Sequence, residues 1–196
     1  MSDSWNDFAD GWDDNPAVIN YAEQAFASIT NTLDIKDLKG LRILDFGCGT
    51  GTLSEKLSPF VGKIVALDPA DKMIDVLKQK IKANQLANIQ PLVAELDQAL
   101  INNNQCLQPK FDLIVASSSL AFVPDYLAML ILLKQLLKPD ALLIQWDWLK
   151  AEDQEGSGFS ESEITKTYDK AGFSSCTTSL PFSLEDMRVI MALVKP

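Results

Sequence analysis

Residues 41–53, LRILDFGCGTGTL, are the stretch that decides how the chain folds. A short apolar run of the length of a buried strand comes first, and Asp45 follows it. Three glycines then alternate with other residues: Gly47, Gly49 and Gly51. A helical segment, Thr52–Ser58, completes the stretch. Because glycine has no Cβ, a loop of this kind lets a ligand lie against the main chain at a helix start.

The glycine spacing differs from that of two common nucleotide-binding loops. A dinucleotide loop has its third glycine five residues after the first, whereas Gly51 comes four residues after Gly47. A P-loop needs Gly-Lys-Ser/Thr, which this sequence does not contain. The Asp45 carboxylate would repel a pyrophosphate but suits a ligand that carries a cation, such as an amino-acid ammonium beside a sulfonium.

The segment Asp45–Gly51 (DFGCGTG) resembles the cofactor loop of the class I S-adenosylmethionine-dependent methyltransferases. The resemblance implies S-adenosyl-L-methionine as the cofactor and S-adenosyl-L-homocysteine as the product. It also implies methyl transfer to an O, N, S or C nucleophile on a small-molecule acceptor, mainly through proximity and orientation. The alternative is a glycine-rich turn in another α/β domain.

Strands that alternate with helices predict an α/β fold with a doubly wound sheet. We expect a Rossmann-like, mostly parallel seven-stranded sheet with helices on both faces and an antiparallel closing strand. Residues 1–34 are expected to form an N-terminal helical cap, and residues 35–196 the S-adenosylmethionine-binding methyltransferase domain. Within that domain we expect a helix from Pro124 to Lys138 and a strand from Leu142 to Leu149.

Two helix starts are marked by short local patterns. Asn15-Pro16 places an N-cap residue directly before a proline at the first helical position. Ser160-Glu-Ser-Glu163 is a capping box, which predicts a helix over residues 161–171.

Asp68 follows a second apolar run, Lys63–Leu67, and lies 23 residues after Asp45. A βαβ unit presents an acidic residue to a ribose at about this spacing. The carboxylate would accept hydrogen bonds from both ribose hydroxyls. The alternative is that Asp68 caps the following helix or turn.

In the resembling family, an acidic residue after the third strand often accepts from the adenine amino group. The resemblance assigns that role to Glu95 and a backbone contact with the ring to Leu96, with Asp97 as the alternative to Glu95. A solvated carboxylate at a helix start is the structural alternative. Residues 111–117, FDLIVAS, resemble the family segment that ends at the active site. The candidate cofactor-binding residues are Asp45, Gly47, Cys48, Gly49, Gly51, Asp68, Pro69, Glu95, Leu96 and Ser117.

Five residues are candidates for the acceptor side: Trp12, Tyr21, Ser118, Phe122 and Trp146. In the family, an N-terminal helical segment often lies over the cofactor pocket, so Trp12 and Tyr21 are candidates to close it. Many small-molecule members have a histidine near the position of Phe122, which this chain lacks. Trp146 or Trp148 would wall an acceptor pocket. Simple packing of these aromatic side chains is the alternative.

A general base is not identified by the sequence. Asp147, Asp125, Tyr21 and Ser118 are the candidates to orient or deprotonate the acceptor. The chain contains no histidine, which excludes histidine-based triads and most zinc sites, and no metal is expected.

The composition narrows the class of partner. With 17 basic and 27 acidic side chains the net charge is −10, and such a surface repels nucleic acid and anionic lipid. No uncharged apolar run reaches about 18 residues, so no membrane span is expected. Three widely spaced cysteines and an acidic, polar start favour the cytoplasm. We expect a small-molecule acceptor and a monomer or homodimer.

Two other functions fit parts of the pattern. A non-catalytic S-adenosylmethionine-binding sensor or partner subunit would share the loop but would not turn the cofactor over. A nicotinamide-dependent oxidoreductase is opposed by the glycine spacing and by Asp45.

Overall fold

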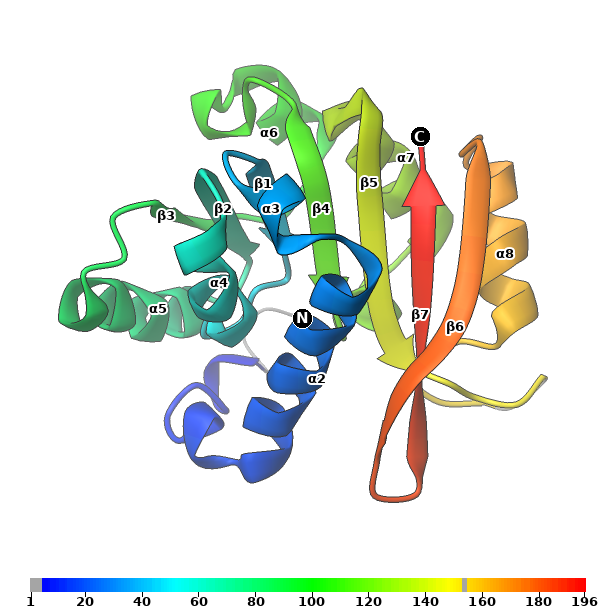
Figure 1. The fold of residues 1–196 in the computed structure, drawn as a ribbon, viewed down its shortest axis with the longest axis horizontal. Coiled ribbons are helices and arrows are strands. Elements are labelled where there is room, and N and C mark those ends of the chain that lie inside the picture. Colours follow the sequence, from blue (N-terminus) through cyan, green and yellow to red (C-terminus); the bar gives the residue numbers. More distant parts are fainter. Residues whose placement is uncertain (1–4, 153–154) are drawn as a thin grey trace. The chain divides into compact units, whose positions relative to one another are not determined.

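The computed structural model describes residues 5–152 and 155–196, and the chain divides into two units, residues 1–95 and 96–196. Figure 1 labels the helices and strands of both units. Within the described ranges, no helix is both long and apolar enough to cross a membrane.

The first unit is built on three parallel strands in the order β3-β2-β1. Ile64 of the middle strand is paired with Ile43 on one side and Ile89 on the other, and all three are buried. Such apolar strands are typical of a parallel sheet covered on both faces. The elements are η1 (Trp12–Asp14), α2 (Pro16–Thr32), α3 (Ile35–Leu38), β1 (Arg42–Phe46), α4 (Thr52–Leu57), η2 (Ser58–Phe60), β2 (Lys63–Asp68), α5 (Asp71–Asn84) and β3 (Ile89–Val93).

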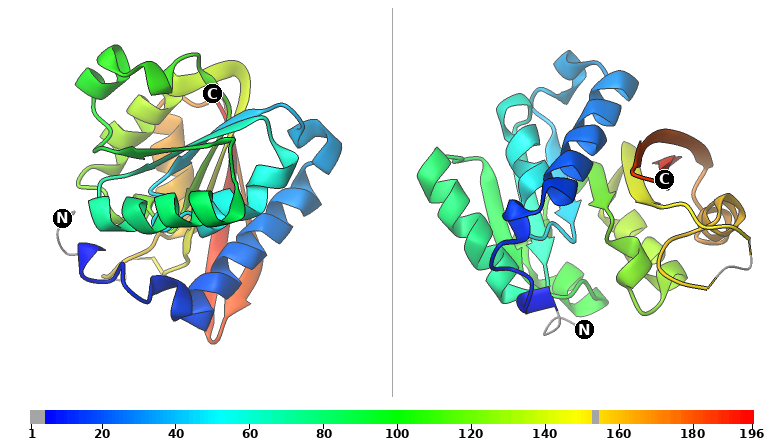
Figure 2. Two further views of the ribbon diagram at one scale, coloured as in Figure 1. Left: turned by 90° about the vertical axis from the view of Figure 1, so that its left-hand side faces the viewer. Right: turned by 90° about the horizontal axis from the view of Figure 1, so that it is seen from below.

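Helices α2, α4 and α5 pack within this unit. Helix α5 lies alongside β2 and β3, and α2 packs against α4 (Figure 2). The predicted start of α2 is confirmed, because the Asn15 side chain accepts a hydrogen bond from the Ala17 N–H at 3.0 Å and Pro16 is the first helical residue.

The second unit contains four strands in the order β4-β5-β7-β6. Strands β4 and β5 are parallel, and β7 is antiparallel to both of its neighbours. The predicted capping box at Ser160 and Glu163 is confirmed at the start of α8. The elements are α6 (Gln98–Asn103), η3 (Gln105–Leu107), β4 (Phe111–Ser117), η4 (Leu120–Phe122), α7 (Tyr126–Leu136), β5 (Leu137–Trp148), α8 (Glu161–Lys170), β6 (Ser175–Leu184) and β7 (Met187–Lys195).

The bounds predicted for the helix after β4 are wrong at both ends. The helix was expected over Pro124–Lys138, but α7 spans only Tyr126–Leu136. Asp125 has extended backbone angles, and its side chain accepts a hydrogen bond from the Ala128 N–H at 2.9 Å. An aspartate in this position is an N-cap, so the helix begins after it.

The bounds predicted for the next strand are also wrong, because β5 begins at Leu137 instead of Leu142. Leu137 is paired with Phe111 and Leu142 with Leu113, so the register shifts between these two pairs. Between these two pairs β5 advances by five residues and β4 by two, so the pairing is irregular there although β5 continues as a strand.

The predicted fold class is confirmed: seven strands, mostly parallel, with an antiparallel closing strand and flanking helices. The boundary predicted between residues 34 and 35 stays a prediction, and residues 1–4 of the predicted cap lie outside the described ranges.

Candidate cofactor site

The glycine loop between β1 and α4 has the backbone conformation that its sequence predicts. Gly47, Gly49 and Gly51 all have positive φ angles, of 66°, 54° and 77°. A Cβ placed on Gly51 would lie 2.4 Å from Cδ1 of Leu77, a side chain of α5. Both the left-handed backbone and the close packing of the neighbouring helix therefore require glycine at this position.

The start of the loop is attached to the end of β2. The backbone N–H groups of Gly47 and Cys48 both donate to the carbonyl oxygen of Leu67, at 2.8 and 3.1 Å. Burial, and then the charges of Asp45 and Asp68, raise the pKa of the Cys48 thiol well above its ordinary value. This shift favours the neutral thiol form of Cys48.

Asp45 is a buried acid at the carboxyl end of β1. Its Oδ2 accepts a hydrogen bond from the Ser54 hydroxyl at 2.6 Å. Burial raises the pKa of Asp45 to about 6; the bond from Ser54 opposes this and the charge of Asp68 adds to it. A positively charged group brought next to Asp45 would favour its ionised form.

Asp68 connects the end of β2 to two backbone segments. Its Oδ2 accepts from the N–H of Gly49 and its Oδ1 from the N–H of Ala70, both at 2.8 Å. Burial raises its pKa, while these two hydrogen bonds lower it. Asp68 therefore caps the turn that follows β2, which is the alternative that the sequence analysis gave for this residue. Each carboxylate oxygen has a second lone pair, so the same side chain still has acceptor capacity for a ligand hydroxyl. Pro69 joins Asp68 to Ala70.

Trp12 lies against the glycine loop. A Cβ placed on Gly49 would be 3.9 Å from Nε1 of Trp12, which is ordinary van der Waals contact. Trp12 also packs edge-on against Trp5, with ring centroids 6.0 Å apart. Tyr21, the other residue expected to close the site, is buried in α2. The first unit thus brings together Asp45, the glycine loop, Asp68 and Trp12.

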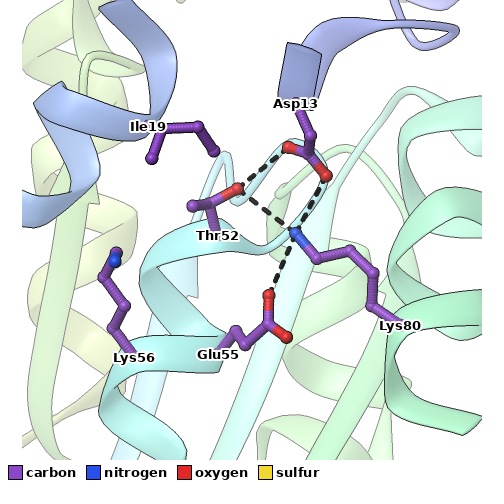
Figure 3. A pocket seen from close by; sticks show the side chains of 6 residues that line it. All are labelled: Asp13, Ile19, Thr52, Glu55, Lys56 and Lys80. Atoms are coloured by element: carbon purple, nitrogen blue, oxygen red, sulfur yellow. Dashed lines mark hydrogen bonds and ion pairs between the residues drawn. The ribbon is translucent and has the colours of Figure 1, made fainter. Parts of the chain in front are cut away.

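One cluster beside this loop was missed by the sequence analysis. Asp13 contacts the hydroxyls of Thr50 and Thr52 and the ammonium group of Lys80. Figure 3 shows Asp13, Thr52 and Lys80 in the lining of a pocket of about 410 Å³. Nothing local marks Asp13 among the other aspartates near the start of the chain. Its partners lie 37, 39 and 67 residues away in sequence, so no spacing rule connects them.

The second unit places Ser117 at the end of β4, paired with Trp146 of β5. The next residue, Ser118, has a positive φ of 52°, and its N–H donates to the Trp146 carbonyl oxygen at 2.7 Å. Non-glycine residues with such angles often occur at functional sites. Phe122 ends the short helix η4, and the Trp146 side chain is fully buried, as the packing alternative predicts.

The adenine candidates follow β3 in the sequence, where Glu95 is the last residue of the first unit and Leu96 the first of the second. Glu95 is exposed, Leu96 is buried, and Asp97 caps α6 by accepting from the Leu100 N–H at 2.6 Å. The capping bond occupies one oxygen of Asp97, so Glu95 has more acceptor capacity left for a ligand.

A buried polar network surrounds Asp147 at the end of β5. The hydroxyls of Tyr126 and Tyr168 both donate to Oε1 of Gln145, at 2.6 and 2.8 Å, and Nε2 of Gln145 donates to Oδ2 of Asp147 at 2.8 Å. Within the described part of the chain, Oδ1 of Asp147 has no well-formed hydrogen bond. Burial raises the pKa of Asp147 to about 7, while Gln145 and the nearby Ala121 backbone lower it.

Comparison with known proteins identifies the family. A family model described as a methyltransferase domain matches residues 19–174. The chain belongs to this methyltransferase domain family. Over 140 residues it is 30% identical to an uncharacterized methyltransferase of Schizosaccharomyces pombe, covering 70% of this chain and 49% of that protein.

Two other relatives of this methyltransferase-family chain have names that mention a quinone. It is 28% identical to a demethylmenaquinone methyltransferase of Lactococcus lactis, covering 74% of this chain and 56% of that protein. It is 30% identical to a ubiquinone biosynthesis O-methyltransferase of Actinobacillus pleuropneumoniae, covering 66% of this chain and 51% of that protein. The chain thus spans about half the length of these relatives.

Solved structures of methyltransferases share the fold. The DhpI–SAH complex superimposes with a TM-score of 0.74 at 18% identity, covering 100% of this chain and 94% of that chain. A SAM-dependent methyltransferase from Aquifex aeolicus gives a TM-score of 0.63 at 23% identity, covering 85% of this chain and 92% of that chain. These likenesses support the predicted fold.

Proposed function

We propose that this protein transfers a methyl group from S-adenosyl-L-methionine to a small-molecule acceptor. The observation that carries the proposal is the joint arrangement of Gly49 and Asp68. The left-handed Gly49 donates its N–H to a buried carboxylate, which brings a close-approach loop and a hydroxyl-binding acid side by side.

The residues of the first unit fit the cofactor chemically. Asp45 is buried with a pKa raised to about 6, and a cation beside it would favour its ionised form. The amino-acid end of the cofactor therefore belongs on the β1 side of the loop. Asp68 would hold the ribose hydroxyls, and Pro69 would lie beside them. Glu95 and Leu96 would meet the adenine ring, and Ser117 would complete the cofactor side.

The bound cofactor supplies a methyl group on a positively charged sulfur, and the chain's own residues orient the partners of the reaction. These residues would hold the acceptor atom in line with that methyl group, and the acceptor's proton would leave to a base or to solvent. We propose that Ser118 and Phe122 shape the acceptor side, and that the fully buried Trp146 supports them only by packing. In the first unit, Trp12 and Tyr21 are proposed to close the cofactor loop.

The acceptor is proposed to be an aromatic compound with ring hydroxyls. Two relatives act, by their names, in the synthesis of menaquinone and ubiquinone. A phenol, with a pKa near 10 like that of tyrosine, ionises far more readily than an aliphatic alcohol. Such an acceptor suits a chain without histidine. The net charge of −10 opposes a nucleic-acid substrate. We further propose a cytoplasmic monomer or homodimer.

Ligand-induced stabilisation tests the cofactor assignment. At about 100 times its Kd, S-adenosylhomocysteine should add about 2.7 kcal/mol, which raises the Tm by roughly 5–10 °C for a domain of this size. NADH, as the matched control, should leave the Tm unchanged. Stabilisation by NADH and not by S-adenosylhomocysteine would reject the assignment.

The second candidate function is a non-catalytic cofactor-binding protein, which the absence of histidine favours. A turnover assay distinguishes it from an enzyme. Methyl-labelled S-adenosylmethionine is incubated with catechols, hydroquinones and naphthohydroquinones, and labelled product is counted. An enzyme transfers the label to at least one of them, whereas a sensor binds the cofactor and leaves the label on it.

A further inference from the structure

The carboxylate of Asp13 joins three separate elements of the first unit. Its Oδ1 accepts hydrogen bonds from the hydroxyls of Thr50 and Thr52, at 2.7 and 3.0 Å. Its Oδ2 forms an ion pair with Nζ of Lys80 at 3.0 Å. Figure 3 shows Asp13, Thr52 and Lys80, whose side chains point toward one another from η1, the start of α4 and α5.

The position of the two threonines gives this contact its significance. Thr50 and Thr52 flank Gly51, the left-handed residue that caps α4. Lys80 also pairs with Glu55 of α4 at 3.2 Å. One carboxylate near the start of the chain therefore holds both sides of the last glycine of the cofactor loop.

The segment that contains Asp13 lies along the same loops. We call residues 5–14 the N-terminal cover. Near its start, the Asn6 side chain accepts a hydrogen bond from the Lys72 N–H at 3.1 Å, at the beginning of α5. Ala9 packs with Ala70 and Met73 just after the end of β2. Figure 2 shows the cover, in dark blue, beside α5.

The cover thus follows the two proposed cofactor loops within the unit, from the segment after Asp68 to the glycine loop. Trp12, the neighbour of Asp13, lies in contact range of Gly49. The aromatic and small side chains of the cover supply packing, whereas Asp13 supplies the only described ion pair that links the cover to α5.

We propose that Asp13 is a positioning residue that latches the N-terminal cover onto the glycine loop, so that the cofactor associates and dissociates only when this latch opens. The inference rests on the proposed function, because it concerns the exchange of the cofactor at the same loop. Asp13 acts through Thr50, Thr52 and Lys80, and does not itself touch the cofactor.

The latch is closed over the ordinary pH range. Burial opposes the ionisation of Asp13, but the hydrogen bonds from Thr50 and Lys80, the charge of Lys80 and the hydrogen bond from Thr52 together lower its pKa. Asp13 is therefore ionised at neutral pH. Because the ion pair is only partly buried, added salt should weaken the latch.

A latch of this kind has a kinetic signature. Opening of the cover is a barrier common to association and dissociation, so weakening the latch raises both rate constants together. A side chain that only contacted the bound ligand would change the dissociation rate alone. The ratio of the two rate constants therefore distinguishes a latch from a ligand contact.

The test measures S-adenosylhomocysteine binding by stopped-flow fluorescence of the four tryptophans in the full chain. In Asp13→Ala, kon and koff should both rise, by roughly 10- to 100-fold, because charged and neutral hydrogen bonds are lost together. The Kd should change by less than about threefold, because the same barrier is removed in both directions. Asp10→Ala, which removes a charge from the same segment, is the matched control and should behave like the wild type.

Two outcomes would overturn the latch. One is unchanged rate constants in Asp13→Ala while the wild type binds normally, and the other is a faster koff with an unchanged kon. If Asp13→Ala folds poorly, Thr50→Val and Thr52→Val remove the hydroxyl donors one at a time, and each should raise both rate constants by a smaller factor. Failure of the wild type to bind S-adenosylhomocysteine at all would instead defeat the proposed function.

Discussion

The Asp68 carboxylate accepts a hydrogen bond from the Gly49 N–H at 2.8 Å, which joins the end of β2 to the middle of a loop 19 residues earlier in the chain. The same carboxylate accepts from the N–H of Ala70. A single side chain thereby sets the position of both loops at which the sequence predicts a nucleoside to bind.

Replacement of Asp68 by alanine should weaken S-adenosylhomocysteine binding by roughly 10- to 150-fold, because charge-assisted bonds to hydroxyls contribute about 1.5–3 kcal/mol. Isothermal titration calorimetry measures the change. Asp75→Ala, an exposed aspartate on α5, is the control and should bind like the wild type. Unchanged affinity in Asp68→Ala would show that the ribose is held by other groups.

Cofactor binding should depend on pH through Asp45, whose pKa is raised to about 6. A cationic ligand binds the ionised form, so affinity should fall as the pH drops below 6, by roughly tenfold from pH 7.5 to pH 5. In Asp45→Asn the affinity should be low at neutral pH and nearly independent of pH. A wild-type affinity that stays constant over this pH range would show that Asp45 does not interact with the cationic group of the ligand.

Alanine at Gly51 should destabilise the fold, because its Cβ would meet Leu77 at 2.4 Å and φ is 77°. Overpacking costs about 1–3 kcal/mol, to which the left-handed backbone adds about 1–2 kcal/mol. Urea unfolding measures the total. Gly40→Ala, which has a φ of 84° and no atom within 4 Å of the new Cβ, isolates the backbone contribution. Equal losses in the two variants would argue against the clash with Leu77.

The buried Asp147 should make stability fall as the pH rises. Its pKa in the folded protein is about 7, above the ordinary 3.8, so the neutral form is favoured by folding. The stability it contributes is fully present below pH 3.8 and is lost progressively up to about pH 7. The loss amounts to about 2–3 kcal/mol between pH 5 and pH 8.

Urea unfolding of the wild type and Asp147→Asn at both pH values tests this prediction. Both proteins contain Asp45, whose raised pKa also makes stability depend on pH. The difference between their two pH dependences therefore isolates the contribution of Asp147. Parallel pH profiles would show that the Asp147 carboxyl is charged, or solvated, to the same extent in both folded and unfolded chains.

Several features were predictable because they depend on neighbours in sequence. The left-handed angles of Gly47, Gly49 and Gly51 follow from residue type, and the caps at Asn15 and Ser160 follow from short-range side chain–backbone geometry. The start of β5 was predicted wrongly because it depends on which residues of β4 pair with β5, and the register of that pairing shifts near the start. Such a shift has no local signal as clear as a cap.

The sequence by itself thus determined the fold class, the family and the loop of three glycines, because each is encoded by residue types at short, regular spacing. Only the tertiary structure decided that Asp13 lies on Thr50 and Thr52, and that Asp147 is buried with one oxygen lacking a hydrogen bond among the described residues. Those relationships depend on side chains that packing brings together across long stretches of chain. A carboxylate also changes its pKa according to the water and charges around it, which no local pattern records.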